Sequence, residues 1–158
     1  MDRSASIDRY AAGFDAVVAA LDGITAAELD HRPAPGEWSP RQVVHHLADS
    51  EARSFIRLRQ LLAEDGGVIQ AYDQDRWAER LPYDLPVEVS LPVVQAVRGL
   101  SLATVRTLEA AGDTAWDRAA THPEHDEPYT LDLWLALYAE HPHDHAAQIR
   151  AAREHALR

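Results

Sequence analysis

The sequence predicts an all-α fold, namely an antiparallel four-helix bundle with one or two long crossover connections. Apolar residues recur at steps of three and four along four stretches, which is the period of an amphipathic helix. Helix-start and helix-stop signals flank these stretches, and no segment shows a convincing strand pattern. The 158 residues contain no internal repeat, low-complexity segment or linker, so we expect a single domain over residues 1–158.

The first helix is predicted from about Ser6 to Leu21, and Gly23 ends it. A short helix can follow, because Thr25 and Glu28 have the spacing of a capping box. The apolar stripe of the first helix is formed by Ile7, Tyr10, Phe14, Val17, Val18 and Leu21.

The second helix has the clearest start. Ser39 suits the N-cap, Pro40 suits the first helical position, and Gln42 completes a capping box. The helical period then continues to about Leu62, before a turn at residues 65–67. The stripe that we expect to face inward consists of Val43, His46, Leu47, Ser50, Ser54, Leu58 and Leu61.

Residues 68–89 form a long connection, in which residues 75–81 can make a helical turn or two. Connections of this length often carry function, here as a lid or a pocket wall. The interpretation that we favour is a crossover that only packs its aromatic residues on the bundle. The third helix is predicted from Ser90 to Gly112, with Pro92 in its first turn. Its stripe consists of Val94, Val97, Ser101, Val105 and Leu108.

The last helix is predicted to follow a loop over residues 113–129, with Thr130 as its N-cap, and to run nearly to the end of the chain. Pro142 lies inside it and cannot donate a hydrogen bond to the Tyr138 carbonyl, so we expect a kink at this point. Its stripe consists of Trp134, Leu137, Tyr138, His141, His145, Gln148, Ile149 and Ala152.

Composition and charge exclude several classes of function. The 26 acidic residues outnumber the 15 basic ones, and a net charge of −11 argues against nucleic-acid binding. No apolar run is long enough to span a membrane, and no signal peptide is visible, so a cytoplasmic location is expected. The absence of cysteine excludes disulfides, thiolate ligands and a cysteine nucleophile. No pattern typical of a serine hydrolase or a phosphate-binding loop is present.

Three of the nine histidines suggest a metal site. His141 and His145 are four residues apart, so a helix places both rings on one face, where they can reach one ion. His46 lies on the inward stripe of another helix. Three imidazoles would leave coordination positions for water or substrate, which is typical of catalytic sites. The alternative is that these are core histidines that are each satisfied by hydrogen bonds.

The other histidines have less informative positions. His45 is expected to be exposed, and His143 should face solvent because it lies about 200° around the helix from His141. His122 and His125 lie in an acidic, proline-containing segment that we interpret as a solvated loop. Two more histidines are assigned no role: His31 and His155.

Three acidic residues lie close to the candidate ligands in the sequence. Asp49 and Asp144 could orient a ligand or act as a base, although the interpretation that we favour is that both are surface charges. Glu140 is a possible substitute ligand, because a kink at Pro142 could turn it inward.

Two segments resemble motifs of the DinB/YfiT-like superfamily of metalloenzymes. Residues 37–49 resemble its Trp-Ser…His-Leu segment, and residues 141–149 resemble its C-terminal His-x-x-x-His-x-x-Gln-Ile motif. Residues 75–77 and 129–132 are also similar, so the resemblance covers essentially the whole chain. It implies an up-down-down-up bundle and a site for one divalent metal ion, zinc or nickel. The ligands implied by the matching positions are His46, His141 and His145.

The resemblance also implies a choice of functions. The protein would be a metal-dependent hydrolase, or an S-transferase that uses a low-molecular-weight thiol, acting on a small-molecule substrate. The alternative is a non-catalytic metal-binding or stress-response protein. Open coordination positions favour catalysis, whereas a fourth protein ligand such as Glu140 favours the alternative. Relatives often pair as homodimers. Pro142 and His143 depart from the usual motif, which leaves open whether His143 competes for the metal.

Overall fold

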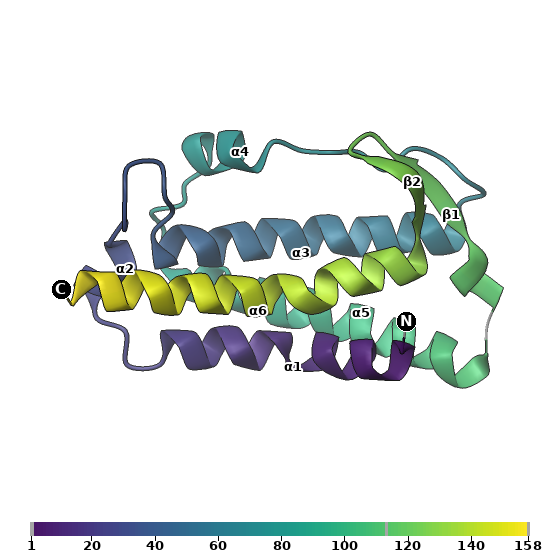
Figure 1. Cartoon of the computed structure of the whole chain (residues 1–158), viewed down its shortest axis with the longest axis horizontal. Coiled ribbons are helices and arrows are strands. Elements are labelled where there is room, and N and C mark those ends of the chain that lie inside the picture. The colour runs from purple at the N-terminus through teal and green to yellow at the C-terminus, as the bar shows by residue number, and fades with distance from the viewer. Residues whose placement is uncertain (1, 113, 158) are drawn as a thin grey trace.

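The computed structural model describes residues 2–112 and 114–157. The single-domain prediction also includes Met1, Asp113 and Arg158, which lie outside the described residues. Four long helices form the bundle, as Figure 1 shows. They are α1 (Arg3–Leu21), α3 (Pro40–Ala63), α5 (Leu91–Ala111) and α6 (Leu131–Ala156).

The four helices have the up-down-down-up order. In Figure 1, α1 and α6 run in one direction and α3 and α5 run in the other. Helix α1 packs beside α6 and α5, and α3 packs beside the same two helices. Each helix therefore has one parallel and one antiparallel neighbour. This architecture confirms the predicted four-helix bundle.

The helix ends follow the predicted capping signals. The Ser39 side chain accepts from Gln42 N and completes a capping box at the start of α3. Thr25 forms a second capping box and begins α2 (Ala26–Asp30), and Thr130 caps α6. Helix α1 begins earlier than predicted because the Asp2 side chain accepts from Ala5 N. Gly112 ends α5 with a φ of 60°, which few residues other than glycine adopt readily.

The long connection between α3 and α5 contains local structure. Helix α4 (Gln74–Arg80) confirms the helical turns that were expected within residues 75–81, and Asp73 caps its first turn. A 3-10 helix, η1 (Val87–Val89), precedes α5, and another, η2 (Thr114–Asp117), follows it. Figure 1 shows that α4 lies beside the first half of α3. This connection therefore covers one side of α3.

The expectation of a loop without strands over residues 113–129 was wrong. Strands β1 (Ala119–His122) and β2 (His125–Thr130) form an antiparallel hairpin. Strand β1 has only four residues, which is too few to reveal an alternating pattern by itself. The hairpin is stabilised by the segment after α3, because Ile69 N donates to Thr121 O and Thr121 N donates to Gly67 O. Strand pairing with a distant segment is invisible in a local pattern.

The core consists of two hydrophobic clusters with a polar layer between them. The first is centred on Tyr10, Trp134 and Leu135, and the second on Val17, Leu47 and Ile149. Leu137, which was expected to face inward, is 40% exposed and lies outside both clusters. The polar layer contains three histidines and an ion pair: His46, His141, His145, Glu51 and Arg98.

No helix in the described part of the chain is both long enough and apolar enough to cross a membrane.

Candidate metal centre

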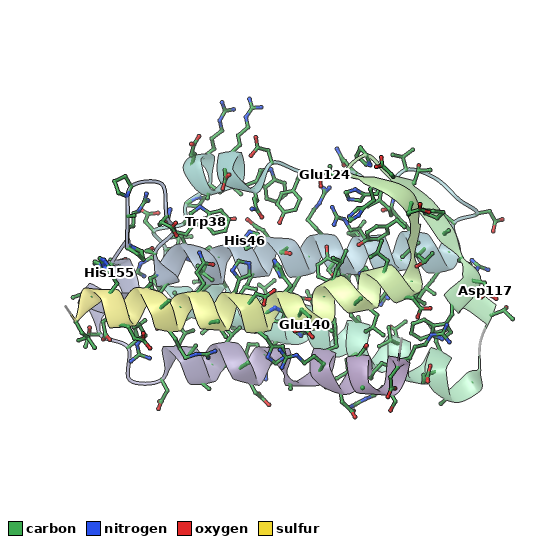
Figure 2. The ribbon with its side chains drawn as sticks, viewed as in Figure 1. Trp38, His46, Asp117, Glu124, Glu140 and His155 are labelled. Carbon is green, nitrogen blue, oxygen red and sulfur yellow. The ribbon has the colours of Figure 1, made fainter. Side chains whose placement is uncertain are left out.

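Three histidine side chains converge in the polar layer. His46 lies in the first half of α3 (Figure 2), and its Nε2 is 3.3 Å from the Nε2 of His141 on α6. The Nε2 of His145, one turn further along α6, is 3.1 Å from the same atom. The three candidate ligand atoms all lie within 4.8 Å of one another. The two helices thus bring together all three histidines that the sequence singled out.

The two shortest of these separations match those of nitrogens bound to one divalent ion. Two nitrogens that bind one Zn²⁺ at about 2.0–2.1 Å with a tetrahedral angle lie about 3.3–3.4 Å apart, and a right angle gives about 3 Å. The observed 3.1 Å and 3.3 Å agree with this range. The Nδ1 atoms of His46 and His141 are buried and have no hydrogen-bond partner among the described residues. The convergent Nε2 atoms are therefore where these two rings can find a polar partner.

The imidazoles are held in the form that binds metals. Burial, and to a smaller extent the neighbouring His145, lower the pKa of His46 to about 3. Burial also lowers the pKa of His141 well below its usual value, and that of His145 in the same direction. All three rings are consequently neutral at pH 7. Each can offer a ring nitrogen lone pair without first losing a proton.

Gln148 orients the third ring. Its Oε1 lies 2.8 Å from His145 Nδ1 and accepts a hydrogen bond from it. A proton on Nδ1 leaves the lone pair of the neutral ring on Nε2, which faces the cluster. This partner explains the glutamine that follows the two histidines in the last helix.

Replacing Gln148 with leucine is expected to weaken Zn²⁺ binding by about 10- to 100-fold, because the His145 ring loses its orienting partner. Competition with a chromophoric chelator measures this affinity. Gln95→Leu is the matched control, since Gln95 is exposed on α5. Equal affinities in the two variants would contradict an orienting role for Gln148.

Arg98 compensates for the proline in α6. The helix continues through Pro142 without a break, although Pro142 cannot bond to the Tyr138 carbonyl. The Arg98 guanidinium on α5 donates to that carbonyl at 2.9 Å, and to Tyr10 O at 2.7 Å. Its Nη1 pairs with the buried Glu51 carboxylate. His141 and His145 therefore keep their spacing despite the proline.

Sequence reasoning missed Arg98 and Glu51, although a signal was present. Arg98 falls between Val94 and Ser101, and Glu51 falls between Leu47 and Ser54, at steps of three and four along buried stripes. A charged residue at such a position requires a buried partner. One acidic and one basic residue on two inward faces thus predict an ion pair.

Helix α1 approaches Pro142 closely at Gly13. A Cβ atom at Gly13 would lie 2.5 Å from Pro142 Cγ and 2.7 Å from Arg98 Nη2. Gly13→Ala is therefore expected to destabilise the protein by about 1–3 kcal/mol, as overpacked cores do. Urea unfolding measures the change. Gly99→Ala on α5 is the control, because no heavy atom lies within 4 Å of its added Cβ. The Gly99→Ala control should raise the free energy of unfolding by about 0.5–1 kcal/mol. A similar increase for Gly13→Ala would contradict the close packing at Gly13.

The two possible competitors of the ligands do not join the cluster. Glu140, labelled in Figure 2, is exposed and pairs with Arg9 on α1 at 2.9 Å. His143 is half-buried, and its Nε2 lies 3.0 Å from the Arg9 carbonyl oxygen. Both side chains therefore turn toward α1, away from the three histidines.

Two expectations about other histidines were wrong. His45 is only 5% exposed, because the long connection covers it and provides hydrogen-bond partners at Ser90 Oγ and Leu85 O. His122 is not in a solvated loop but is 4% exposed, and it stacks on Tyr129 in the hairpin. In both cases a segment that is distant in sequence supplies the burial.

The acidic residues near the ligands have different environments. Asp49 is half-buried and accepts a hydrogen bond from the Tyr83 hydroxyl at 2.6 Å, whereas Asp144 is exposed. The Tyr83 contact ties Asp49 to the long connection.

A surface cavity adjoins the cluster at His145. A cavity of about 310 Å³ is lined by His145 and Gln148 on α6, and by Trp38 before α3. The Trp38 ring packs against His46, with 4.7 Å between the ring centroids. Gln74 and Asp75 of α4 form the opposite wall. The long connection therefore does form a pocket wall beside the histidines.

The fold and this cluster together define a four-helix-bundle protein with a three-histidine site that adjoins an open cavity. The sequence profile of the DinB superfamily matches residues 9–149. The chain belongs to the DinB superfamily, which confirms the resemblance found in its two histidine segments.

Two relatives have names that concern metal-dependent hydrolysis. A Bacillus subtilis protein named "Putative metal-dependent hydrolase YfiT" is 37% identical over 131 residues, which cover 82% of this chain and 72% of the relative. A similarly named Oceanobacillus iheyensis protein is 36% identical over 122 residues, which cover 77% and 69% of the two chains.

A solved structure has the same architecture. YfiT from Bacillus subtilis, described as "a probable metal-dependent hydrolase with an unusual four-helix bundle topology", superimposes with a TM-score of 0.86 and 33% identity. The match covers 96% of this chain and 85% of that chain. The fold is therefore shared along nearly the whole chain.

Proposed function

We propose that this protein is a metal-dependent hydrolase of small-molecule substrates. One divalent ion, zinc or nickel, would be held by His46, His141 and His145. The observation that carries the proposal is the convergence of three neutral imidazole nitrogens at separations of 3.1 Å and 3.3 Å. The names of the relatives agree with this chemistry.

Access to the cluster favours an enzyme over a non-catalytic metal-binding protein. Three protein ligands leave coordination positions free, and no carboxylate joins the histidines among the described residues. The cavity at His145 gives a small molecule a route to those positions. A structural or sensing site would be expected to have a fourth protein ligand, and Glu140 is instead paired with Arg9.

Each residue of the site has a definable task. A divalent ion bound there would supply a Lewis acid that activates water and polarises a carbonyl group. Gln148 keeps the Nδ1 proton of His145 in place, so that Nε2 continues to face the cluster. Trp38 covers His46 and limits the access of water from that side. Arg98 holds the α6 backbone at Tyr138 and so maintains the spacing of the two α6 histidines.

The S-transferase alternative would use the same free positions for a low-molecular-weight thiol in place of water. The hydrolase and transferase functions are therefore tested together. Protein loaded with Zn²⁺ or Ni²⁺ is assayed against esters, amides and thiol-conjugation substrates.

We expect metal-dependent hydrolysis that His46→Ala abolishes and His143→Ala retains. His143 is the matched control because it lies between the two α6 ligands and contacts only α1 by hydrogen bond. Conjugation without hydrolysis would establish the transferase instead. A panel that stays inert with metal bound would favour the non-catalytic protein.

A further inference from the structure

A second, larger cavity lies between α3 and the long connection. Its volume is about 700 Å³, and Arg57 of α3 and Tyr72 of the long connection line it. Gln74 lines both this cavity and the one beside His145, so the two adjoin at the start of α4. Glu124, at the turn of the hairpin (Figure 2), also lines the larger cavity.

Arg57 lies on the same face of α3 as His46. The two residues are eleven positions apart, which corresponds to about three turns, a rotation of roughly 20° and about 16 Å along the helix axis. Long side chains on a helix lean toward its N-terminus, so the Arg57 side chain extends toward His46. Arg53 lies on the same stripe between them.

A tyrosine connects the guanidinium to the metal site. Arg57 Nη1 donates to the Tyr138 hydroxyl at 2.9 Å. The Tyr138 ring lies 6.1 Å from the His141 ring, measured between centroids. The Tyr138 side chain therefore bridges the Arg57 guanidinium and the His141 ring.

The positive charge of Arg57 has no acidic partner within residues 2–112 and 114–157, although the protein is acidic overall. Among the described residues, no carboxylate forms an ion pair with Arg57 or Arg53, and both donate to the Gln70 carbonyl. Five other arginines do form ion pairs, and the net charge of the chain is −11. A half-buried guanidinium that faces a cavity and donates only to neutral acceptors is suited to an incoming anion.

Two acidic residues also line this cavity, and neither neutralises Arg57. The Asp73 side chain accepts from Arg76 N at the start of α4, which occupies it as a helix cap. Glu124 is exposed at the hairpin turn, on the opposite side of the opening.

We propose that Arg57 binds a carboxylate of the substrate while the reacting group of the same molecule lies at the three-histidine site. This inference rests on the proposed hydrolase function and narrows its substrates to acids. The scissile ester or amide and the free carboxylate would then be joined by a chain long enough to span the Tyr138 side chain. A phosphate could use the same guanidinium, so both anions are included in the test. The simpler alternative is that Arg57 only fastens the connection to α3 through Gln70.

The test measures binding rather than turnover. Co²⁺-loaded protein is titrated with straight-chain dicarboxylates from succinate to suberate, with butyrate as the monocarboxylate and with inorganic phosphate. Calorimetry gives the affinity, and the visible spectrum of Co²⁺ reports ligation at the histidines. We expect one of the longer dicarboxylates to bind about tenfold or more tightly than butyrate, because a charged hydrogen bond is added.

Arg57→Gln should remove this preference, and Arg57→Lys should retain part of it. Arg59→Gln is the matched control, because its guanidinium lies over Phe55 and near Thr104 of α5, outside the cavity lining. Circular dichroism and the Co²⁺ spectrum without added acid establish that each variant is folded. Phosphate could instead bind more tightly than every dicarboxylate, and Arg57→Gln could remove that binding. The anion bound by Arg57 would then be a phosphate and not a carboxylate.

The outcomes separate this inference from the proposed function. If Co²⁺ binds but dicarboxylates show no preference that depends on Arg57, the carboxylate site is overturned and the hydrolase proposal stands. Equal losses in Arg57→Gln and Arg59→Gln would also overturn it, because they would reflect overall charge. If Co²⁺ does not bind, the same titrations of metal-free protein still decide. Anion binding that depends on Arg57 would then support the carboxylate site while the metal proposal fails. If no such anion binding is found, the carboxylate site and the metal proposal are both overturned.

Discussion

His141→Ala is expected to abolish tight binding of a divalent metal. His141 is the central member of the cluster, since its Nε2 lies within 3.3 Å of the Nε2 of both other histidines. Without His141, only one ligand nitrogen remains on each of the two helices. Two nitrogens hold an ion much less firmly than the three of the complete cluster. The affinity should fall by more than the roughly 100-fold that loss of an outer-shell partner costs. Elemental analysis of protein purified without chelator, together with Zn²⁺ titration, measures the effect.

The variant His143→Ala controls for the loss of any histidine from α6. His143 bonds to the Arg9 carbonyl and should leave the metal content unchanged. His145→Ala is expected to resemble His141→Ala. The proposed site would be ruled out if His141→Ala and His145→Ala both retained the metal content of the original protein.

Arg98→Met is expected to cause the largest loss of stability. Glu51 would be left buried with no partner for its charge, and the removal of one member of a buried ion pair costs about 3–5 kcal/mol. The carbonyls of Tyr10 and Tyr138 would also lose their donors. Urea unfolding with a fixed slope gives the change in the free energy of unfolding.

A double-mutant cycle tests why α6 needs Arg98. Pro142→Ala restores a backbone N–H that can bond to the Tyr138 carbonyl. In that background, Arg98→Met should cost about 1–3 kcal/mol less, because one buried carbonyl keeps a donor. Leu100→Ala, a change at an exposed position on the same helix, should show no such coupling. Full additivity of the Arg98 and Pro142 changes would mean that the guanidinium does not replace the missing bond.

Local signals in the sequence were sufficient for the helical framework. The capping boxes at Thr25 and Ser39 and the N-cap at Thr130 depend on residues within three positions of one another. The pairing of His141 with His145 is similarly local. Such features were predicted correctly because the physics that fixes them acts within one helical turn.

Features that depend on distant segments were not predictable in the same way. His45 is buried because residues 85–90 return to cover it, and the short strand at residues 119–122 is stabilised by residues 67–69. To predict that Arg57 lines a cavity, one would have to know the path of the long connection. The role of Arg98 required the knowledge that α5 passes beside Pro142.

The polar layer in the middle of the bundle also fixes the register of the helices. Apolar side chains alone permit neighbouring helices to slide, because one leucine can replace another after a shift of one turn. A shift of α5 by one turn, about 5.4 Å, would carry Arg98 into an apolar cluster and away from Glu51. The contact between Gly13 and Pro142 also opposes sliding, because only glycine leaves room for the proline ring at that level. Sliding is therefore penalised at the level where α3 and α6 must match for three imidazoles to meet.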